Sequence, residues 1–201
     1  MWDGSGSWIG GTARDIARAV RRGDTSATQV VADHLDYIQA NDAVLNAFRV
    51  VRAAAAITEA EAVDEQEDLA NLPLAGVPIA VKENTAVAGL PAWHGSAAAR
   101  GPVADADHEV VRRLRGAGAV VVGTTRMPEL GLWATTDDET AITRNPWRTD
   151  RTPGARPDLR RRRCSRRRPA PRPRARAGTH GGTRRRRDSS CAAPVRSRPA
   201  P

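Results

Sequence analysis

The first third of the chain carries apolar residues at helical spacing, and this pattern predicts three helices. Residues 12–22 form the first, with an apolar face made of Ala13, Ile16, Ala17 and Val20. Gly23 follows as a stop signal, and Ser26 and Gln29 have the spacing of a capping box that opens a second helix. An alanine-rich, acidic stretch at residues 47–69 predicts a third helix over much of its length.

The periodicity changes to that of strands farther along the chain. Apolar residues alternate at residues 77–81, although Pro78 donates no hydrogen bond to a sheet, so this strand lies at a sheet edge or begins near Ile79. A continuous apolar run at residues 119–122 is typical of a strand covered on both faces. Between them, Asp107 is placed to cap a helix whose apolar side carries Val110, Val111, Leu114 and Ala117. Strand, helix and strand in this order predict an α/β fold with a mixed or parallel sheet.

The composition changes sharply after Gly154, so the net charge of the whole chain describes neither part. Residues 155–201 hold 17 Arg and two Asp, a formal +15, and the +9 of the chain therefore leaves −6 on residues 1–154. In the basic part like charges repel and few apolar residues offset the entropy of ordering. We therefore expect one domain at 1–154 and a disordered Arg/Pro-rich tail at 155–201.

Cysteine positions and hydropathy argue against several protein classes. Cys164 and Cys191 both lie in the basic tail, with neither a disulfide framework nor metal-ligand spacing, so we expect no cofactor and no metal. The N-terminus lacks the basic-then-apolar pattern of a secretory signal, and no apolar stretch approaches membrane-spanning length. We therefore expect a cytoplasmic protein that does not bind a membrane.

Lys82 is the only lysine in a chain that otherwise uses arginine for positive charge. An ammonium group can lose its proton when it is buried, whereas a guanidinium group cannot, so a single lysine is a candidate general base. The simpler alternative is a solvated lysine at the end of a strand. The next two residues, Glu83 and Asn84, either orient the lysine or are ordinary polar residues at a strand end.

Other polar and aromatic residues have simpler explanations. We interpret His94, in a loop, and His108, near a helix N-terminus, as solvated histidines. The adjacent acids Asp137, Asp138 and Glu139 suggest a metal cluster, but no further ligands converge on them, so we expect them to be solvated too. Three aromatic residues are expected to pack loops and not to bind a ligand, namely Trp93, Trp133 and Trp147.

Seven short motifs follow one another in a characteristic order between residues 12 and 154. They are LNAF at 45–48, LAGVPIAVKEN at 74–84, AGLP at 88–91, LRGAGAVVVGTT at 114–125, PELG at 128–131, TRNPW at 143–147 and RTPG at 151–154. As a set, they resemble the amidase signature family. The resemblance implies an α/β fold with helices flanking a mixed sheet, of which this chain holds the N-terminal part.

The resemblance also implies a reaction, the hydrolysis of a small-molecule carboxamide by a Ser–Ser–Lys triad. Lys82 would be the general base. One serine, held by a cis peptide bond, would relay the proton, and a second serine would attack the carbonyl and form an acyl-enzyme that water opens. Backbone N–H groups of a glycine-rich segment would stabilise the oxyanion.

The sequence departs from the family's pattern after Gly154, where both serines should follow. The serines of the tail stand alone in arginine-rich surroundings and match neither of them: Ser165, Ser189, Ser190 and Ser197. Tandem GGC glycine codons read as CGG arginine codons when shifted by one base. Suitable codons for residues 158–162 and 184–188, shifted in this way, give Thr-Ser-Gly-Gly-Gly and Gly-Gly-Gly-Ala-Ile. We hypothesise a frameshift near codon 154 that truncates the amidase before both serines and leaves this chain inactive.

A different interpretation comes from the basic tail. Arginine-rich segments bind nucleic acid electrostatically, so the chain is alternatively a basic-tailed nucleic-acid-binding protein on a retired enzyme scaffold. The tail has no aromatic residue for base stacking and no recognisable nucleic-acid module, which favours non-specific binding. A further hypothesis, that a separate polypeptide supplies the missing half of the active site, has no support in the sequence.

Overall fold

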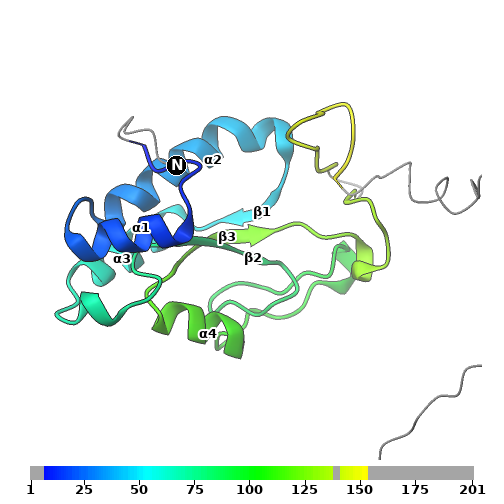
Figure 1. Ribbon diagram of the computed structural model, residues 1–201. Coiled ribbons are helices and arrows are strands. Elements are labelled where there is room, and N and C mark those ends of the chain that lie inside the picture. The colour runs from blue at the N-terminus through cyan, green and yellow to red at the C-terminus, as the bar shows by residue number, and fades with distance from the viewer. Residues whose placement is uncertain (1–6, 138–140, 154–201) are drawn as a thin grey trace, which may run out of the picture. The chain divides into compact units, whose positions relative to one another are not determined.

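The computed structural model describes residues 7–137 and 141–153. Its regular elements are the helices α1 (Ala13–Arg22), α2 (Ala27–Leu45), α3 (Ala53–Asp64) and α4 (Glu109–Gly116) and the strands β1 (Phe48–Val51), β2 (Pro78–Lys82) and β3 (Val120–Thr125). Figure 1 shows α1, α2 and α3 on one side of the sheet and α4 on the other. The predicted α/β class with helices flanking a mixed sheet is confirmed. The predicted tail at 155–201 lies outside the described residues.

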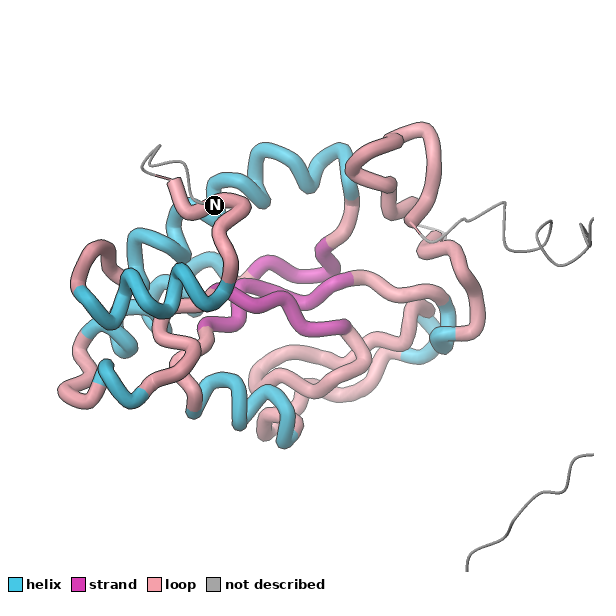
Figure 2. Tube along the Cα trace, in the orientation of Figure 1, coloured by secondary structure: helices cyan, strands magenta, loops and turns pink. Residues whose placement is uncertain are grey.

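The sheet has the strand order β1–β3–β2 (Figure 2). β2 runs parallel to β3, as expected for two strands joined through a helix, whereas β1 runs antiparallel to it. Pro78 is the first residue of β2, which is an edge strand of the described sheet. The edge position resolves the conflict between proline and sheet pairing, since the missing N–H faces no partner strand.

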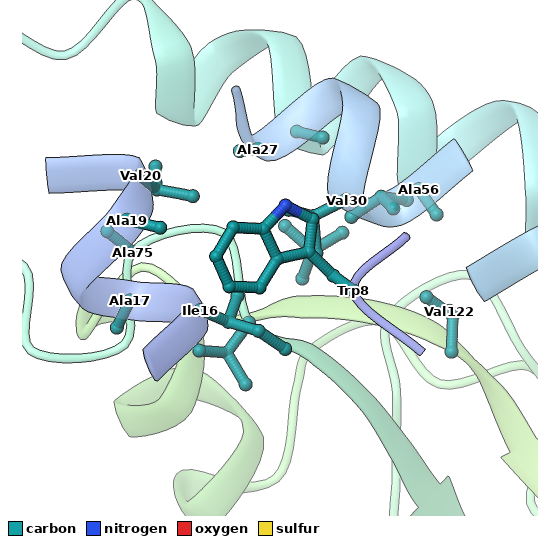
Figure 3. Close-up of a cluster of buried hydrophobic side chains, with 14 of the residues drawn as sticks. Trp8, Ile16, Ala17, Ala19, Val20, Ala27, Val30, Ala56, Ala75 and Val122 are labelled. Atoms are coloured by element: carbon teal, nitrogen blue, oxygen red, sulfur yellow. The ribbon is translucent and has the colours of Figure 1, made fainter. Parts of the chain in front are cut away.

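Two apolar clusters pack on opposite faces of the central strand. Val120 and Val122 of β3 contribute to the larger one, which contains residues of α1, α2 and α3 together with Trp8 (Figure 3). Val121 belongs to the smaller cluster, with Val111 of α4. Consecutive residues of a strand point to opposite faces, so one continuous apolar run supplies both cores, as the sequence predicted.

The predicted stop of α1 at Gly23 is confirmed, and the predicted capping box at the start of α2 forms in part. The Thr12 hydroxyl accepts from the backbone N–H of Asp15, and Gly23 ends α1 with a positive φ of 71°. Ser26 accepts from the N–H of Gln29 at 3.0 Å, which is one half of the capping box. The other half is absent because the Gln29 amide donates to Asp33. Among the described residues, no helix is long and apolar enough to cross a membrane.

The prediction of one helix over much of residues 47–69 is wrong at its beginning. Asn46, with φ of 49°, ends α2, and β1 then occupies Phe48–Val51 before α3 starts at Ala53. Phe48, Val50 and Val51 of β1 pair with β3 in the sheet, with an irregularity at Arg49. Tertiary pairing therefore keeps Phe48–Val51 out of the helix, whereas the alanine-rich run that follows forms α3 as its propensity favours.

The predicted start of α4 is also displaced by one residue. His108, and not Asp107, is the N-cap, because its ring nitrogen Nδ1 accepts from the N–H of Val110 at 3.2 Å. Asp107 instead accepts from the N–H of Ala88 at 2.8 Å and pairs with Arg115 at 3.2 Å. Val110 was predicted to lie on the apolar side, yet it is 53% exposed.

Gly123 is a point of close approach between β3 and β1. A Cβ atom at this position would clash with the carbonyl oxygen of Val50 and lie 3.2 Å from the Cα atom of Val51. We predict that Gly123→Ala lowers the free energy of unfolding by about 2 kcal/mol, because a packed sheet resists being forced apart. Urea denaturation followed by circular dichroism measures the change.

Gly116→Ala is the matched control for this prediction. A Cβ atom at Gly116, in the last turn of α4, would meet no atom within 4 Å. Alanine is the better helix former, so this variant should keep or raise the free energy of unfolding by up to about 1 kcal/mol. Equal losses in both variants would show that the strand contact is not the cause.

Candidate active site

Lys82 is the last residue of β2 and lies in register with Thr125, the last residue of β3. The two strands are parallel, so both residues are at the same end of the sheet. The carboxyl ends of parallel strands are where α/β proteins usually place their ligands. Lys82 is exposed, and its side-chain amine makes no hydrogen bond or ion pair with any other residue that the structure describes.

Glu83, the next residue, is buried and only 1% exposed. Its Oε2 accepts from Nε of Arg49 on β1 at 2.7 Å, and its Oε1 accepts from the backbone N–H of Met127 at 2.8 Å. One carboxylate thus joins β1, the end of β2 and the segment after β3. The suggestion that Glu83 orients Lys82 through its side chain therefore gives way to a structural role, since both carboxylate oxygens bind other groups.

Backbone hydrogen bonds fix the chain on both sides of Lys82. The N–H of Glu83 donates to the carbonyl of Thr125 at 3.0 Å, which extends the β2–β3 pairing by one step. The carbonyl of Lys82 accepts from the N–H of Thr85 at 2.8 Å and closes a turn, in which Asn84 is exposed. The carbonyl of Glu83 accepts from the N–H of Trp93 at 2.8 Å. The backbone that carries the lysine is therefore held in place although its amine is free to reach outward.

The ring of Trp93 packs against the arginine of the buried Arg49–Glu83 ion pair. The guanidinium of Arg49 stacks over its ring at 4.9 Å from the centroid, and that of Arg100 lies at 5.0 Å. This agrees with the expectation that Trp93 packs a loop. The same expectation is wrong for Trp133 and Trp147, which are 67% and 88% exposed.

The loops that follow β2 and β3 are packed against each other. The carbonyl of His94 accepts from the N–H of Leu130 at 2.7 Å. Gly95 has φ of 73°, and a Cβ atom there would clash with the carbonyl group of Pro128 and lie 2.7 Å from the nitrogen of Glu129. Only glycine fits this contact. In the sequence, Gly95-Ser96 after the AGLP motif indicates a loop at this position. The sequence does not show that this loop packs against Pro128 and Glu129.

The other candidate residues have structural or solvated positions. His94 contributes its backbone to the loop contact, and His108 caps α4. Asp137 accepts from the hydroxyl of Thr135 at 3.1 Å, whereas Asp138 and Glu139 lie outside the described residues. No group of three or more His, Cys, Asp or Glu side chains in the described part is arranged to hold a metal ion.

Comparison with known proteins agrees with this geometry. The profile of the Amidase family matches residues 29–155. A protein of Mycobacterium tuberculosis named as amidase AmiB2 is 44% identical over 140 residues, which is 69% of this chain and 30% of the relative. The chain therefore spans about a third of the length of the relatives it matches.

Solved structures show the same partial coverage. A chain from a vestigial protein complex, solved to trace the evolutionary origins of an s-triazine catabolic enzyme, superposes with a TM-score of 0.65 at 37% identity, covering 69% of this chain and 31% of that one. The peptide amidase of Stenotrophomonas maltophilia superposes with a TM-score of 0.62 at 29% identity, covering 71% and 31%. The fold around Lys82 is thus similar to one part of a larger enzyme.

The buried ion pair predicts a large effect of a single substitution. Glu83→Ala should lower the free energy of unfolding by about 3 to 5 kcal/mol, because it removes both the buried charge that Arg49 pairs with and the acceptor for the N–H of Met127. Glu83→Gln, which keeps an oxygen to accept from the N–H of Met127, should lose less. Urea denaturation of the three proteins measures both differences.

Glu109→Ala serves as the control for removing an ion pair. Hydrogen bonds from Arg112 and Arg113 lower the pKa of Glu109 to about 2, yet this pair is exposed to solvent. Exposed ion pairs contribute little to stability, so the substitution should change the denaturation midpoint only slightly. If Glu83→Ala behaves like Glu109→Ala, the buried carboxylate does not hold the strand ends together.

Proposed function

The chain belongs to the amidase family, and from this membership we propose that it derives from an enzyme that hydrolyses the C–N bond of carboxamides to a carboxylate and an amine or ammonia. The substrate we propose is a small linear or aryl amide, in the cytoplasm. The observation that carries the proposal is the position of Lys82, at the carboxyl end of β2 with an exposed amine on a fixed backbone.

In the proposed reaction Lys82 is the general base. Its amine takes the proton of a relay serine, which in turn takes the proton of the nucleophilic serine. The nucleophilic oxygen attacks the carbonyl carbon of the amide, and the C–N bond breaks as the leaving nitrogen receives the proton. Water then attacks the acyl-enzyme and releases the carboxylate. The lysine ends the cycle in its starting state, so it acts as a base and not as a nucleophile.

The described serines already have local positions that differ from these roles. Ser26 caps α2, and the Ser7 hydroxyl accepts from the N–H of Ile9 at 3.3 Å. Ser96 opens the short 3-10 helix Ala97–Ala99. None of them has a hydrogen bond to Lys82 in the part of the chain that the structure describes. We therefore propose that this chain contains the base without either hydroxyl and is catalytically inactive.

A frameshift is our explanation for the missing serines. We propose that residues 1–154 are the amidase part and that residues 155–201 are translated out of frame. The 17 Arg of the basic tail replace the Gly/Ser-rich sequence that the RTPG motif should introduce. The gene sequence tests this directly, because an alternative frame after codon 154 should encode Gly/Ser-rich amidase sequence. Absence of such a frame would overturn the explanation.

We predict that the purified chain releases no ammonia from benzamide above the rate of a buffer blank. The physical reason is that a base with no hydroxyl to deprotonate leaves the attack step without a nucleophile. Lys82→Ala should give the same null rate in an ammonia-release assay. Hydrolysis by the chain that Lys82→Ala abolishes would contradict the proposed inactivity.

The alternative function, nucleic-acid binding through the basic tail, rests on the formal +15 of residues 155–201. We predict that the full chain retains RNA on a filter at low salt and that residues 1–154 do not. This binding should fall by a factor of about 10³ or more between 50 and 200 mM salt, because it depends on counterion release. Binding that discriminates between RNA sequences at physiological salt would instead support a selected nucleic-acid function.

A further inference from the structure

An apolar groove of about 420 Å³ lies between α2, the end of β1 and the start of α3. These three elements are neighbours in Figure 1. We call it the α2–α3 groove, and its large apolar residues are Leu35 and Ile38 of α2, Val51 of β1 and Ile57 of α3. Ligand sites in proteins are concave, mostly apolar and roughly 300 to 1,000 Å³ in volume, so the groove has the size and lining of a small-molecule site.

The apolar side chains of the groove form one continuous surface. Leu35 is buried in the larger apolar cluster, and Ile38 and Ile57 pack against that cluster from α2 and α3. Val51, which is 40% exposed, lines the same groove from the end of β1. The apolar wall is therefore an extension of the core that reaches solvent, and packing of the two helices holds it in place.

The polar residues of the α2–α3 groove are acidic or neutral, and all three come from α2: Asp36, Gln39 and Asp42. The carboxylate of Asp42 already accepts from the N–H groups of Ala47 and Phe48, at 2.7 and 3.2 Å. Asp36 is exposed, and its carboxylate makes no hydrogen bond or ion pair with any residue that the structure describes. One negative charge at the groove is thus available to a ligand.

The other charges close to the groove do not reverse its sign. Among the described residues, no Lys, Arg or His side chain lines it. Arg52, just before α3, donates to the carbonyl of Val121 at 2.8 Å and pairs with Glu59 at 2.6 Å. The positive end of the α3 dipole does lie at the groove, because the helix starts at Ala53. That end is equivalent to about half a unit charge, which is less than the full charge of either carboxylate.

We propose that the α2–α3 groove binds a small molecule that has an apolar body and an ammonium group. The apolar body contacts Ile38 and Ile57, and the ammonium group pairs with Asp36. Such a ligand satisfies the two properties of the groove at once, its apolar wall and its unpaired carboxylate. The inference is independent of the proposed reaction, since Lys82 does not line the groove.

The test is isothermal titration calorimetry of the full 201-residue chain at low salt, with phenylbutylammonium and the uncharged phenylbutanol as probes. The ammonium probe should bind about two- to fivefold more tightly than the alcohol, because an ion pair with an exposed carboxylate adds a modest gain. Asp36→Asn should remove this difference and leave the affinity for the alcohol unchanged. Glu61→Gln is the matched control, because Glu61 is an exposed acid of α3 that does not line the groove.

A second pair of variants tests the position of the site. Ala53→Phe should weaken the binding of both probes by about tenfold or more, because its ring takes up the volume that the probes fill. Ala54→Phe is the control, since Ala54 is the next exposed residue of α3 and does not line the groove. Lys82→Ala should leave both affinities unchanged. Circular dichroism of each variant checks that its fold is retained.

Each outcome supports or overturns the proposal. Ammonium binding that Ala53→Phe weakens, and that Asp36→Asn reduces to the level of the alcohol, supports it. Equal affinities for the ammonium and the alcohol in the unsubstituted chain overturn the role of Asp36. Tighter binding of the anionic phenylbutyrate, abolished by Ala53→Phe, would show that the start of α3 decides the charge and would also overturn it. Absence of binding, or binding that Ala53→Phe leaves unchanged or Lys82→Ala abolishes, overturns the groove as the site.

Discussion

The buried carboxylate of Glu83 is the interaction on which the end of the sheet depends. It accepts from Arg49 on β1 and from the backbone of Met127 after β3, so three separate segments converge on one charged group. Burying an ion pair costs desolvation energy, which only good geometry and further hydrogen bonds offset. Here both carboxylate oxygens are bound, and the ring of Trp93 stacks on the arginine. The cluster thus joins β1 to the end of β2, in addition to the pairing of both strands with β3.

The same cluster explains how adjacent residues take opposite roles. Val81 and Glu83 are buried, and Lys82 between them is exposed, because side chains alternate along an extended backbone. Glu83 can therefore anchor the strand end without touching the amine beside it. The hydrogen bond from Glu83 to the carbonyl of Thr125 transmits that anchoring to the backbone of the lysine. The position of Lys82 is thus fixed through its bonded neighbour Glu83, and not through any contact that the lysine side chain makes.

The sequence predicted the elements whose signals are local. The start and end of α1, the buried central strand and the edge position of Pro78 all follow from spacing within a few residues. Prediction from the sequence failed where contacts between residues far apart in the chain determine the structure. The strand at Phe48–Val51 forms because β3, more than 70 residues away, pairs with it. The partner of Glu83 could not be predicted either, because Arg49 is separated from it by 34 positions and arginine is the commonest charge in the chain.

The family match and the proposed reaction depend on overlapping but different sets of residues. The family match lies at residues 29–155, and the two apolar clusters on either face of β3 lie largely within the same stretch. Those clusters give the described part of the chain a core of its own, independent of any reaction. Amide hydrolysis by a Ser–Ser–Lys triad is a property of a set, since a base contributes only when a hydroxyl is within reach of it. In the proposed inactive chain, the fold that positions Lys82 would therefore remain without the chemistry, because Glu83 binds Arg49 and the N–H of Met127, and neither of these contacts is to a serine.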